Sequence, residues 1–327
     1  MTALAHDIET APSSRVASGF GFAALSAMAF GLSGSLAKGL LDAGWTAGAA
    51  VTVRVLLAAA VLLIPAAVSL RGQWNRLRDN AGLIVAYGVI GVAGCQLAYF
   101  NAVDHMDVGV ALLIEFTCPV VVVGWMWFRH EQRPGRLTVI GGSLAAGGLV
   151  LVLNLLSGAD IDGIGIVWAL GAMIGAAVYW VISADDDTGL PPLALAAGGL
   201  LCGGVILLIA GLVGVVPFAA TRADVTFAHA TVPWWVPIVG LGVVTAALAY
   251  VLGIAASRRL GSRLASFVGL AEVLTALVFA WLLLDQSPSP VQLGGGALIL
   301  LGVIVVKLGE RQVRQEDFST GSQISTV

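Results

Sequence analysis

Three ionisable residues lie deep inside apolar runs, where a charge is costly. Arg54, Glu115 and Glu272 each lie several residues inside a long stretch that is otherwise almost free of charge. An ionisable side chain near the centre of a bilayer costs at least about 2.5–3.5 kcal/mol on insertion scales. Such residues pair with one another or serve a charged substrate or a proton. These three are therefore the candidates for substrate binding or ion coupling.

The depth of each residue suggests a partner for two of them. At 1.5 Å per helical residue, Arg54 lies about 13 Å past Trp45, and Glu115 lies about 10 Å past Val108 on the same side. Two interpretations stay open: a buried ion pair that joins two helices, or side chains that face a cavity and meet a charged substrate or a proton. Glu272 enters from the other side by about 12 Å and has no cation at matching depth.

Glu272 is the candidate for a proton-carrying group. A buried carboxyl without a cation favours its neutral form over its charged form. The alternative is a protonated glutamate that only donates a hydrogen bond to a helix carbonyl.

Five further polar side chains are candidates for lining a cavity. Aromatic rings with a polar tip suit sites for amphipathic metabolites, although anchoring at the membrane interface or helix packing would also explain them. The candidates are Ser33, Gln96, Tyr99, Tyr179 and Tyr250.

The chain offers no spacing typical of enzymes or of metal sites. Its four histidines lie apart, and Cys95, Cys118 and Cys202 lie far apart in apolar runs, so we interpret the cysteines as packing residues. Phosphate-binding, dinucleotide-binding, HExxH and GxSxG motifs are absent from the sequence. We expect neither a cofactor nor a metal, and no ATP hydrolysis by this chain.

The composition identifies the medium in which these residues must be positioned. Of 327 residues, 58% are hydrophobic and 11% are charged, against about 45–50% and about 25% in soluble domains. The mean hydropathy is +0.96. A net charge of −3 gives no basic face for nucleic acid. The composition therefore predicts a protein embedded in the lipid bilayer.

Ten apolar runs predict an all-α polytopic membrane protein with ten transmembrane helices. Most have 18 or more residues, which is the length of a spanning helix, and they lack the alternation of barrel strands. We interpret the first as an uncleaved helix rather than a signal peptide. The runs are 19–38, 45–69, 81–101, 108–128, 137–156, 163–183, 192–216, 234–256, 264–284 and 291–308.

Basic residues predict the orientation, because cytoplasmic loops are enriched in Lys and Arg. With the N-terminus in the cytoplasm, the outer segments hold only Lys38 and Arg222. The inner segments hold thirteen basic residues, so we expect both termini in the cytoplasm. The thirteen are Arg15, Arg71, Arg76, Arg78, Arg129, Arg133, Arg136, Arg258, Arg259, Arg263, Lys307, Arg311 and Arg314.

The second half of the chain repeats the first. A shift of 154 positions aligns Trp127 with Trp281, Glu131-Gln132 with Asp285-Gln286, Pro134 with Pro288, and Gly141-Gly142 with Gly295-Gly296. Five spans are an odd number, so the second copy must be inverted in the membrane. We expect a cytoplasmic tail at 1–18, repeats at 19–156 and 157–309, and a second cytoplasmic tail at 310–327. Inverted repeats are common in secondary transporters, with the substrate site at the midplane.

This arrangement resembles the EamA-type branch of the drug/metabolite transporter superfamily. The resemblance covers about 19–308 and is carried by 111–119 and 131–134 in the first copy and by 260–273 and 285–290 in the second.

The resemblance implies a secondary carrier of the bacterial cytoplasmic (inner) membrane that exports small metabolites such as amino acids or their derivatives. Alternating access around a midplane cavity is then expected, with a small-molecule substrate, the lipid bilayer and protons as partners, in a monomer or homodimer. Drug or toxic-compound efflux is the alternative within transport. A membrane-embedded enzyme or lipid-handling protein is the alternative of another class, although the apolar runs hold no nucleophile–base pair.

Overall fold

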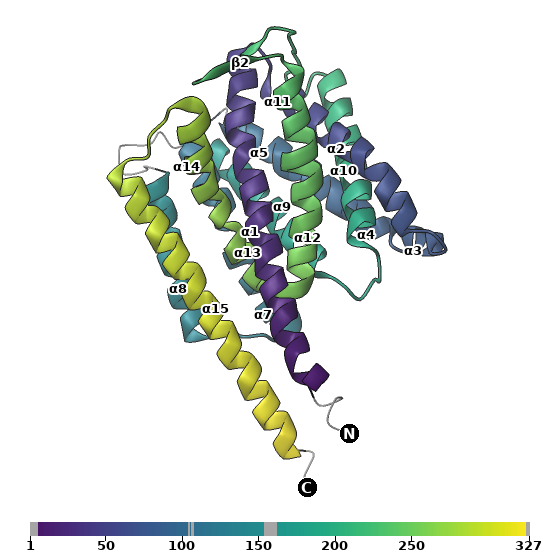
Figure 1. Ribbon diagram of the computed structural model, residues 1–327, viewed down its shortest axis with the longest axis vertical. Coiled ribbons are helices and arrows are strands. Elements are labelled where there is room, and N and C mark those ends of the chain that lie inside the picture. Colours follow the sequence, from purple (N-terminus) through teal and green to yellow (C-terminus); the bar gives the residue numbers. More distant parts are fainter. Residues whose placement is uncertain (1–5, 104, 106–107, 154–161, 325–327) are drawn as a thin grey trace.

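The computed structural model describes residues 6–103, 105, 108–153 and 162–324, and it is a bundle of long helices with both termini at one end (Figure 1). Within these residues, nine helices are long and apolar enough to cross a membrane. The shorter apolar helix Arg136–Val152 completes the set of ten. The predicted all-α polytopic fold is confirmed.

The first half contains five spans, two of which are assembled from shorter segments. The third span joins α4, the π-helical segment η1 and α5, and the fourth joins α6 and α7. The elements are α1 (His6–Asp42), α2 (Ala47–Ser69), α3 (Trp74–Asp79), α4 (Ala81–Ala86), η1 (Tyr87–Gly94), α5 (Cys95–Val103), α6 (Val108–Phe116), α7 (Cys118–His130) and α8 (Arg136–Val152).

The second half repeats this construction. Its third span joins α11, the π-helical segment η3 and α12, and its fourth joins α13 and α14. The elements are α9 (Gly163–Ala184), α10 (Pro192–Leu212), β1 (Val225–Phe227), β2 (Ala230–Val232), α11 (Trp235–Val239), η3 (Gly240–Leu248), α12 (Ala249–Leu260), α13 (Ser262–Gly269), α14 (Ala271–Leu284) and α15 (Pro290–Ile324).

The ends of the predicted segments differ from the structure at three places. The predicted tails 1–18 and 310–327 are largely helical, since α1 begins at His6 and α15 continues to Ile324. The C-terminal extension is rich in Glu, Arg and Gln, which are strong helix formers. The fifth span ends at Val152 rather than 156, and the predicted boundary between 156 and 157 lies outside the described residues.

The backbone conformation also shows the repeat. Glu131 and Asp285, which correspond at the shift of 154, are the two described non-glycine residues with positive φ, at 57° and 58°. Each ends the fourth span of its repeat in the left-handed conformation. Because a left-handed non-glycine residue is uncommon, its occurrence at matched positions is independent support for two structurally equivalent halves.

The fifth helices of the two repeats pack together through glycines. A Cβ on Gly141 would lie 2.6 Å from the Gly302 carbonyl oxygen, and a Cβ on Gly148 would lie 2.5 Å from that of Gly295. The shift of 154 converts the first contact into the second, as a two-fold axis requires. Small residues let helix backbones approach closely in membranes, so α8 and α15 form a symmetric seam (Figure 1).

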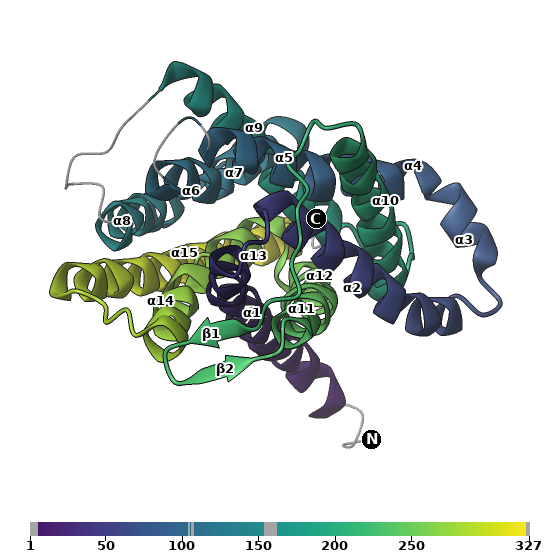
Figure 2. The same ribbon diagram turned by 90° about the horizontal axis from the view of Figure 1, so that it is seen from above.

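The two repeats also exchange helices around their centre. Helix α1 of the first repeat packs against α12 and α14 of the second, and α9 of the second packs against α5, α6 and α7 of the first. Figure 2 shows the resulting arrangement from above, with α1 beside α12 and α9 beside α5. A space between the repeats is therefore lined by both.

A short hairpin, which the apolar runs do not predict, covers the end opposite to the termini. Strands β1 and β2 pair antiparallel, with Thr226 opposite Thr231, and they lie above α1 in Figure 1. Val225 packs with Leu40 and Trp45, so the hairpin attaches this end to α1.

Candidate functional site

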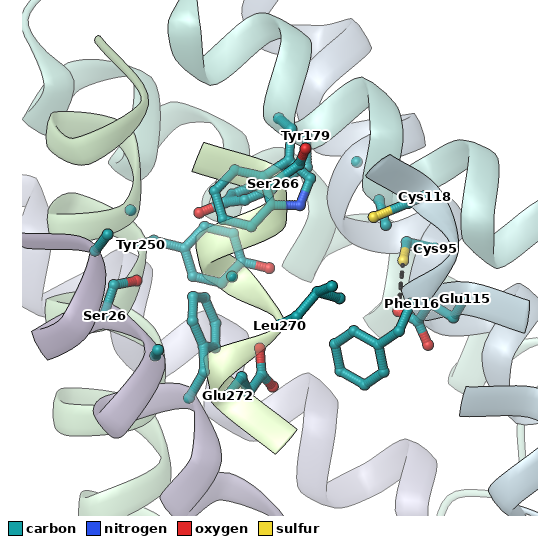
Figure 3. Close-up of a pocket in the computed structure, with 18 of the residues that line it drawn as sticks. Ser26, Cys95, Glu115, Phe116, Cys118, Tyr179, Tyr250, Ser266, Leu270 and Glu272 are labelled. Carbon is teal, nitrogen blue, oxygen red and sulfur yellow. Dashed lines mark hydrogen bonds between the residues drawn. The ribbon is translucent and has the colours of Figure 1, made fainter. Parts of the chain in front are cut away.

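A cavity of about 160 Å³ lies between the two repeats. Its walls come from α1, α2, η1, α5, α6, α7, α9, α12, α13 and α14, so both repeats contribute (Figure 3). We call this space the central cavity. Its polar and charged lining residues are Ser26, Ser33, Arg54, Cys95, Gln96, Glu115, Cys118, Tyr179, Trp180, Tyr250, Ser266 and Glu272.

Breaks in the two fourth spans place both acids at the cavity. Helix α6 ends at Phe116 and α7 begins at Cys118, followed by Pro119. A proline cannot donate to the preceding turn, and it disfavours helical backbone in the residue before it. In the other repeat the break falls at Leu270, after Gly269. Glu115 is thus next to the end of α6, and Glu272 is in the first turn of α14.

The two carboxyls experience opposite helix dipoles. The first turn of a helix carries partial positive charge and the last turn carries partial negative charge. Glu272 therefore lies at the partly positive start of α14, whereas Glu115 lies beside the partly negative end of α6. The acids occupy the same break in the repeat, but they are not electrostatically equivalent.

Arg54 is held by the backbone of the second repeat rather than by Glu115. Its Nη2 donates to the Thr245 carbonyl oxygen at 2.8 Å, its guanidinium lies 6.0 Å from the Phe30 ring centroid, and its charge interacts with the Glu272 carboxyl. Among the described residues no ion pair joins Arg54 to either Glu115 or Glu272. Of the two interpretations that the sequence left open, the structure therefore lacks the Arg54–Glu115 ion pair, and all three side chains line the cavity. The expectation that Glu272 has no cation nearby also changes, because Arg54 lines the same cavity.

The physical reason is packing rather than depth. Helix α2 packs against η3 and α10, and this contact directs Arg54 towards Thr245 and the second repeat. Matching depth in the bilayer was not sufficient, because it does not specify which helices are neighbours.

Glu115 accepts a hydrogen bond from a cysteine. The Cys95 Sγ lies 3.5 Å from the Glu115 Oε1 and 3.4 Å from the Ala172 carbonyl oxygen, as the dashed line in Figure 3 marks. Cys118 also lines the cavity, so two of the three cysteines interpreted as packing residues belong to this site. The break before Pro119 was the signal that could have indicated Cys118.

The other predicted lining residues divide into two groups. Ser33, Gln96, Tyr179 and Tyr250 line the central cavity. Tyr99 is not among its lining residues. It packs with Ala102, Ala111 and Ala169 instead, because it follows Cys95 by four residues and lies one turn beyond the cavity.

An aromatic group forms one wall of the cavity. The Tyr250 ring packs edge-on against Phe30 at 5.3 Å and Tyr179 at 5.5 Å between centroids, and Tyr179 packs against Trp180 at 4.9 Å. Figure 3 shows the Tyr250 hydroxyl directed into the cavity, opposite Glu115. The site therefore combines one cation, two carboxyls and apolar ring surface.

This arrangement can bind a small polar molecule by charge complementarity. Guanidinium donates to carboxylate in charge-assisted hydrogen bonds, and carboxylates accept from ammonium groups. In the described part of the chain, no group of three or more metal-binding side chains is found.

The fold and cavity together define a polytopic membrane protein with inverted repeats and a charged midplane site, a construction typical of secondary transporters. The sequence pattern of the EamA-like transporter family matches residues 17–154 and 163–308. The chain therefore belongs to this family and is a membrane transporter.

Similar proteins support this assignment. The uncharacterized inner membrane transporter YicL of Salmonella typhimurium is 24% identical over 242 residues, which are 72% of this chain and 76% of that protein. The uncharacterized transporter YwfM of Bacillus subtilis is 25% identical over 262 residues, which are 77% and 83% of the two chains. A protein of known crystal structure superposes with a TM-score of 0.72 over 92% of this chain and 99% of its own, at 20% identity, which shows a shared fold.

Proposed function

We propose that this chain exports small zwitterionic metabolites, such as amino acids or their derivatives, across the bacterial inner membrane. The observation that carries the proposal is the central cavity, which places Arg54, Glu115 and Glu272 around one small space. Arg54 would bind the substrate carboxylate, and a glutamate carboxylate would bind its ammonium group. The aromatic wall would contact the apolar part of the substrate.

The size of the cavity favours a metabolite over a drug. Drug-sized ligands occupy pockets of about 300–1,000 Å³, whereas a cavity of about 150 Å³ accepts a benzene-sized molecule. At about 160 Å³, the central cavity suits the smaller class. Efflux of drugs or toxic compounds would require a considerably wider cavity.

Transport rather than catalysis is the activity proposed. Within the described residues the cavity lining contains no serine or cysteine hydrogen-bonded to a histidine, an arrangement that activates a nucleophile. The inverted repeats supply an obvious transport mechanism, since exchanging the conformations of the two halves exposes the same cavity to the opposite side.

The proposed orientation follows the basic residues. Both termini lie at the end that also carries the loop between α9 and α10 (Figure 1), and thirteen basic residues are assigned to that side. We place this end in the cytoplasm, in agreement with the enrichment of Lys and Arg there. The similarity to YicL, an uncharacterized inner membrane transporter, supports the choice of membrane.

Flux in proteoliposomes tests the proposal. Vesicles containing the purified chain are loaded with radiolabelled amino acids, amino-acid derivatives, organic cations and neutral drugs, and efflux is followed. We expect efflux of a zwitterionic compound that is strongly reduced at low substrate concentration in Arg54→Gln and retained in Arg222→Gln, whose side chain is an exposed arginine outside the cavity. Efflux restricted to organic cations or drugs would show that the substrate is not a zwitterionic metabolite. Absence of flux for every compound would count against transport.

A further inference from the structure

Three charged residues meet at the end of the molecule that carries the termini. The Asp186 Oδ1 lies 3.3 Å from the Arg258 Nη1, and its Oδ2 lies 3.7 Å from the Arg15 Nη2. Arg15 begins the membrane-spanning part of α1, Arg258 is near the end of α12, and Asp186 follows α9. The cluster therefore joins three helices that also line the central cavity, and both repeats contribute to it.

The cluster lies directly beyond the cavity along each of these helices. From Tyr179 to Asp186 is about 10 Å, and from Gly253 to Arg258 is about 7 Å, at 1.5 Å per residue. A wider hollow of about 670 Å³ opens past the cluster, lined by Arg15, Ser18, Asp186, Pro192, Arg258 and Arg259. The charged residues thus stand between the cavity and this hollow.

A layer of buried tyrosines separates the cavity from the cluster. Tyr87, Tyr179 and Tyr250 are 0%, 8% and 6% exposed. Tyr179 lies 5.8 Å from Tyr87 between ring centroids, and the Ser183 hydroxyl donates to the Tyr87 hydroxyl at 3.4 Å. Tyr179 and Tyr250 line the cavity, and Tyr87 packs behind Tyr179.

Glycine 253 accommodates the central tyrosine of that layer. A Cβ at this position would lie 2.3 Å from the Tyr179 hydroxyl oxygen and 3.1 Å from the Ser26 hydroxyl oxygen. Both distances are shorter than an ordinary contact, so Tyr179 can occupy its place only because residue 253 has no side chain.

The contacts of Arg258 allow the charged cluster to separate as well as to form. The Arg258 side chain is only 8% exposed, and its Nε and Nη2 have no hydrogen-bond partner among the described residues. A guanidinium has five N–H donors, so a permanent structural contact would be expected to satisfy more of them. Because the buried Arg258 guanidinium is held mainly by Asp186, it loses little stabilisation when the cluster opens and water reaches it.

A contact between the repeats is also present at the opposite end. The His105 Nδ1 lies 3.3 Å from the Asp162 Oδ2. His105 follows the third span of the first repeat and Asp162 precedes the first span of the second repeat. At the end that carries the termini, Asp186 of the second repeat pairs instead with Arg15 of the first repeat and with Arg258. Each end of the molecule thus has a charged contact between the two repeats.

We infer that Asp186, Arg258 and Arg15, together with the tyrosine layer held by Gly253, form the gate that closes the central cavity at the end carrying the termini. The inference rests on the proposed function, because a gate has meaning only for a cavity that alternates its access. Opening separates α1 and α12 from the loop after α9 and withdraws Tyr179 from Gly253.

Accessibility of two native cysteines tests the gate without a substrate. Cys95 and Cys118 line the cavity, whereas Cys202 lies on α10 outside its lining and serves as the internal reference. The full chain is reconstituted into vesicles of known sidedness and treated with a membrane-impermeant thiol reagent from each side. Labelling rates at each cysteine are measured by mass spectrometry in the parent, Asp186→Asn, Gly253→Ala and two controls.

The controls match the two variants in chemistry but not in position. Asp42→Asn removes a carboxylate whose ion pair with Lys38 lies within one helix, and Gly147→Ala adds a methyl group where nothing lies within 4 Å. We expect Asp186→Asn and Gly253→Ala to label Cys95 and Cys118 about tenfold faster from the side of the termini. Tenfold corresponds to about 1.4 kcal/mol in the equilibrium between closed and open states. The controls should label at the parent rate.

Unchanged labelling in both gate variants would overturn the inference, as would an equal increase from both sides. If Asp186→Asn is not monodisperse in detergent, Gly253→Ala decides the question, because it keeps every charge. Transport without faster labelling would refute the gate alone. Faster labelling in a chain that moves none of the compounds tested would support the gate and leave the proposed function at fault.

Discussion

The seam between α8 and α15 gives the sharpest test of the inverted-repeat structure. In Gly148→Ala the new Cβ would lie 2.5 Å from the Gly295 carbonyl oxygen and 2.8 Å from the Ile299 amide nitrogen. Ordinary contact begins at 3.4 Å, so the two helices would have to separate by about 0.9 Å locally. The obstacle is backbone, which cannot rotate away as a side chain would.

The expected change in the free energy of unfolding follows from two opposing effects. Overpacking of a close contact costs about 1–3 kcal/mol, whereas alanine is better than glycine by up to about 1 kcal/mol inside a helix. The net loss expected for Gly148→Ala is therefore about 0.5–2 kcal/mol of unfolding free energy. The neighbouring Gly147→Ala has nothing within 4 Å and should gain about 0.5–1 kcal/mol.

Reversible unfolding of the purified protein in mixed detergent micelles measures these differences. We expect the order of stability Gly147→Ala, parent, Gly148→Ala. Gly302→Ala should behave like Gly148→Ala, because its Cβ would lie 2.5 Å from the Gly141 carbonyl oxygen. Equal stability of Gly147→Ala and Gly148→Ala would show that α8 and α15 do not meet through this face, and would refute the symmetric seam.

Three further predictions concern transport and orientation. Replacing Arg54 by Gln should raise the KM for a carboxylate-bearing substrate about 10–100-fold, since a charged hydrogen bond contributes about 1.5–3 kcal/mol; an unchanged KM in vesicle flux would exclude its contact with the substrate. Replacing Glu272 by Gln should preserve substrate exchange but abolish accumulation driven by a pH gradient; if both modes persist in the same vesicles, Glu272 carries no coupled proton. Reporter fusions at Ser157, which lies outside the described residues, and after Val327 should report periplasmic and cytoplasmic locations respectively, and a cytoplasmic Ser157 would contradict the proposed orientation.

The architecture was predictable because it depends on local and periodic properties of the chain. Apolar runs of about 20 residues match the thickness of a bilayer. The shift of 154 that aligns Trp127 with Trp281 indicates two equivalent halves. The structure confirms both through the ten apolar helices of its described residues and through the matched left-handed residues Glu131 and Asp285. The hairpin before α11 was missed because strands of three residues give too short a pattern.

The site was predictable only in part. A charge in an apolar run is conspicuous, so Arg54, Glu115 and Glu272 could be selected from the sequence, and all three line the cavity. Cys95 is a small, weakly polar residue that resembles any packing residue until its hydrogen bond to Glu115 is seen. Tyr99 and Tyr250 were both selected because each has an aromatic ring with a polar tip, but of these two only Tyr250 lines the cavity.

The sequence by itself thus determined the number of spans, the repeat and the buried ionisable residues, because each of these follows from the cost of polar groups in lipid. Tertiary structure alone decided which residues meet. Arg54 donates to the Thr245 carbonyl oxygen and lines the same cavity as Glu272 because α2 packs against η3. Position along a helix specifies the depth of a residue in the bilayer, whereas its partner depends on which helices are neighbours and how each is rotated.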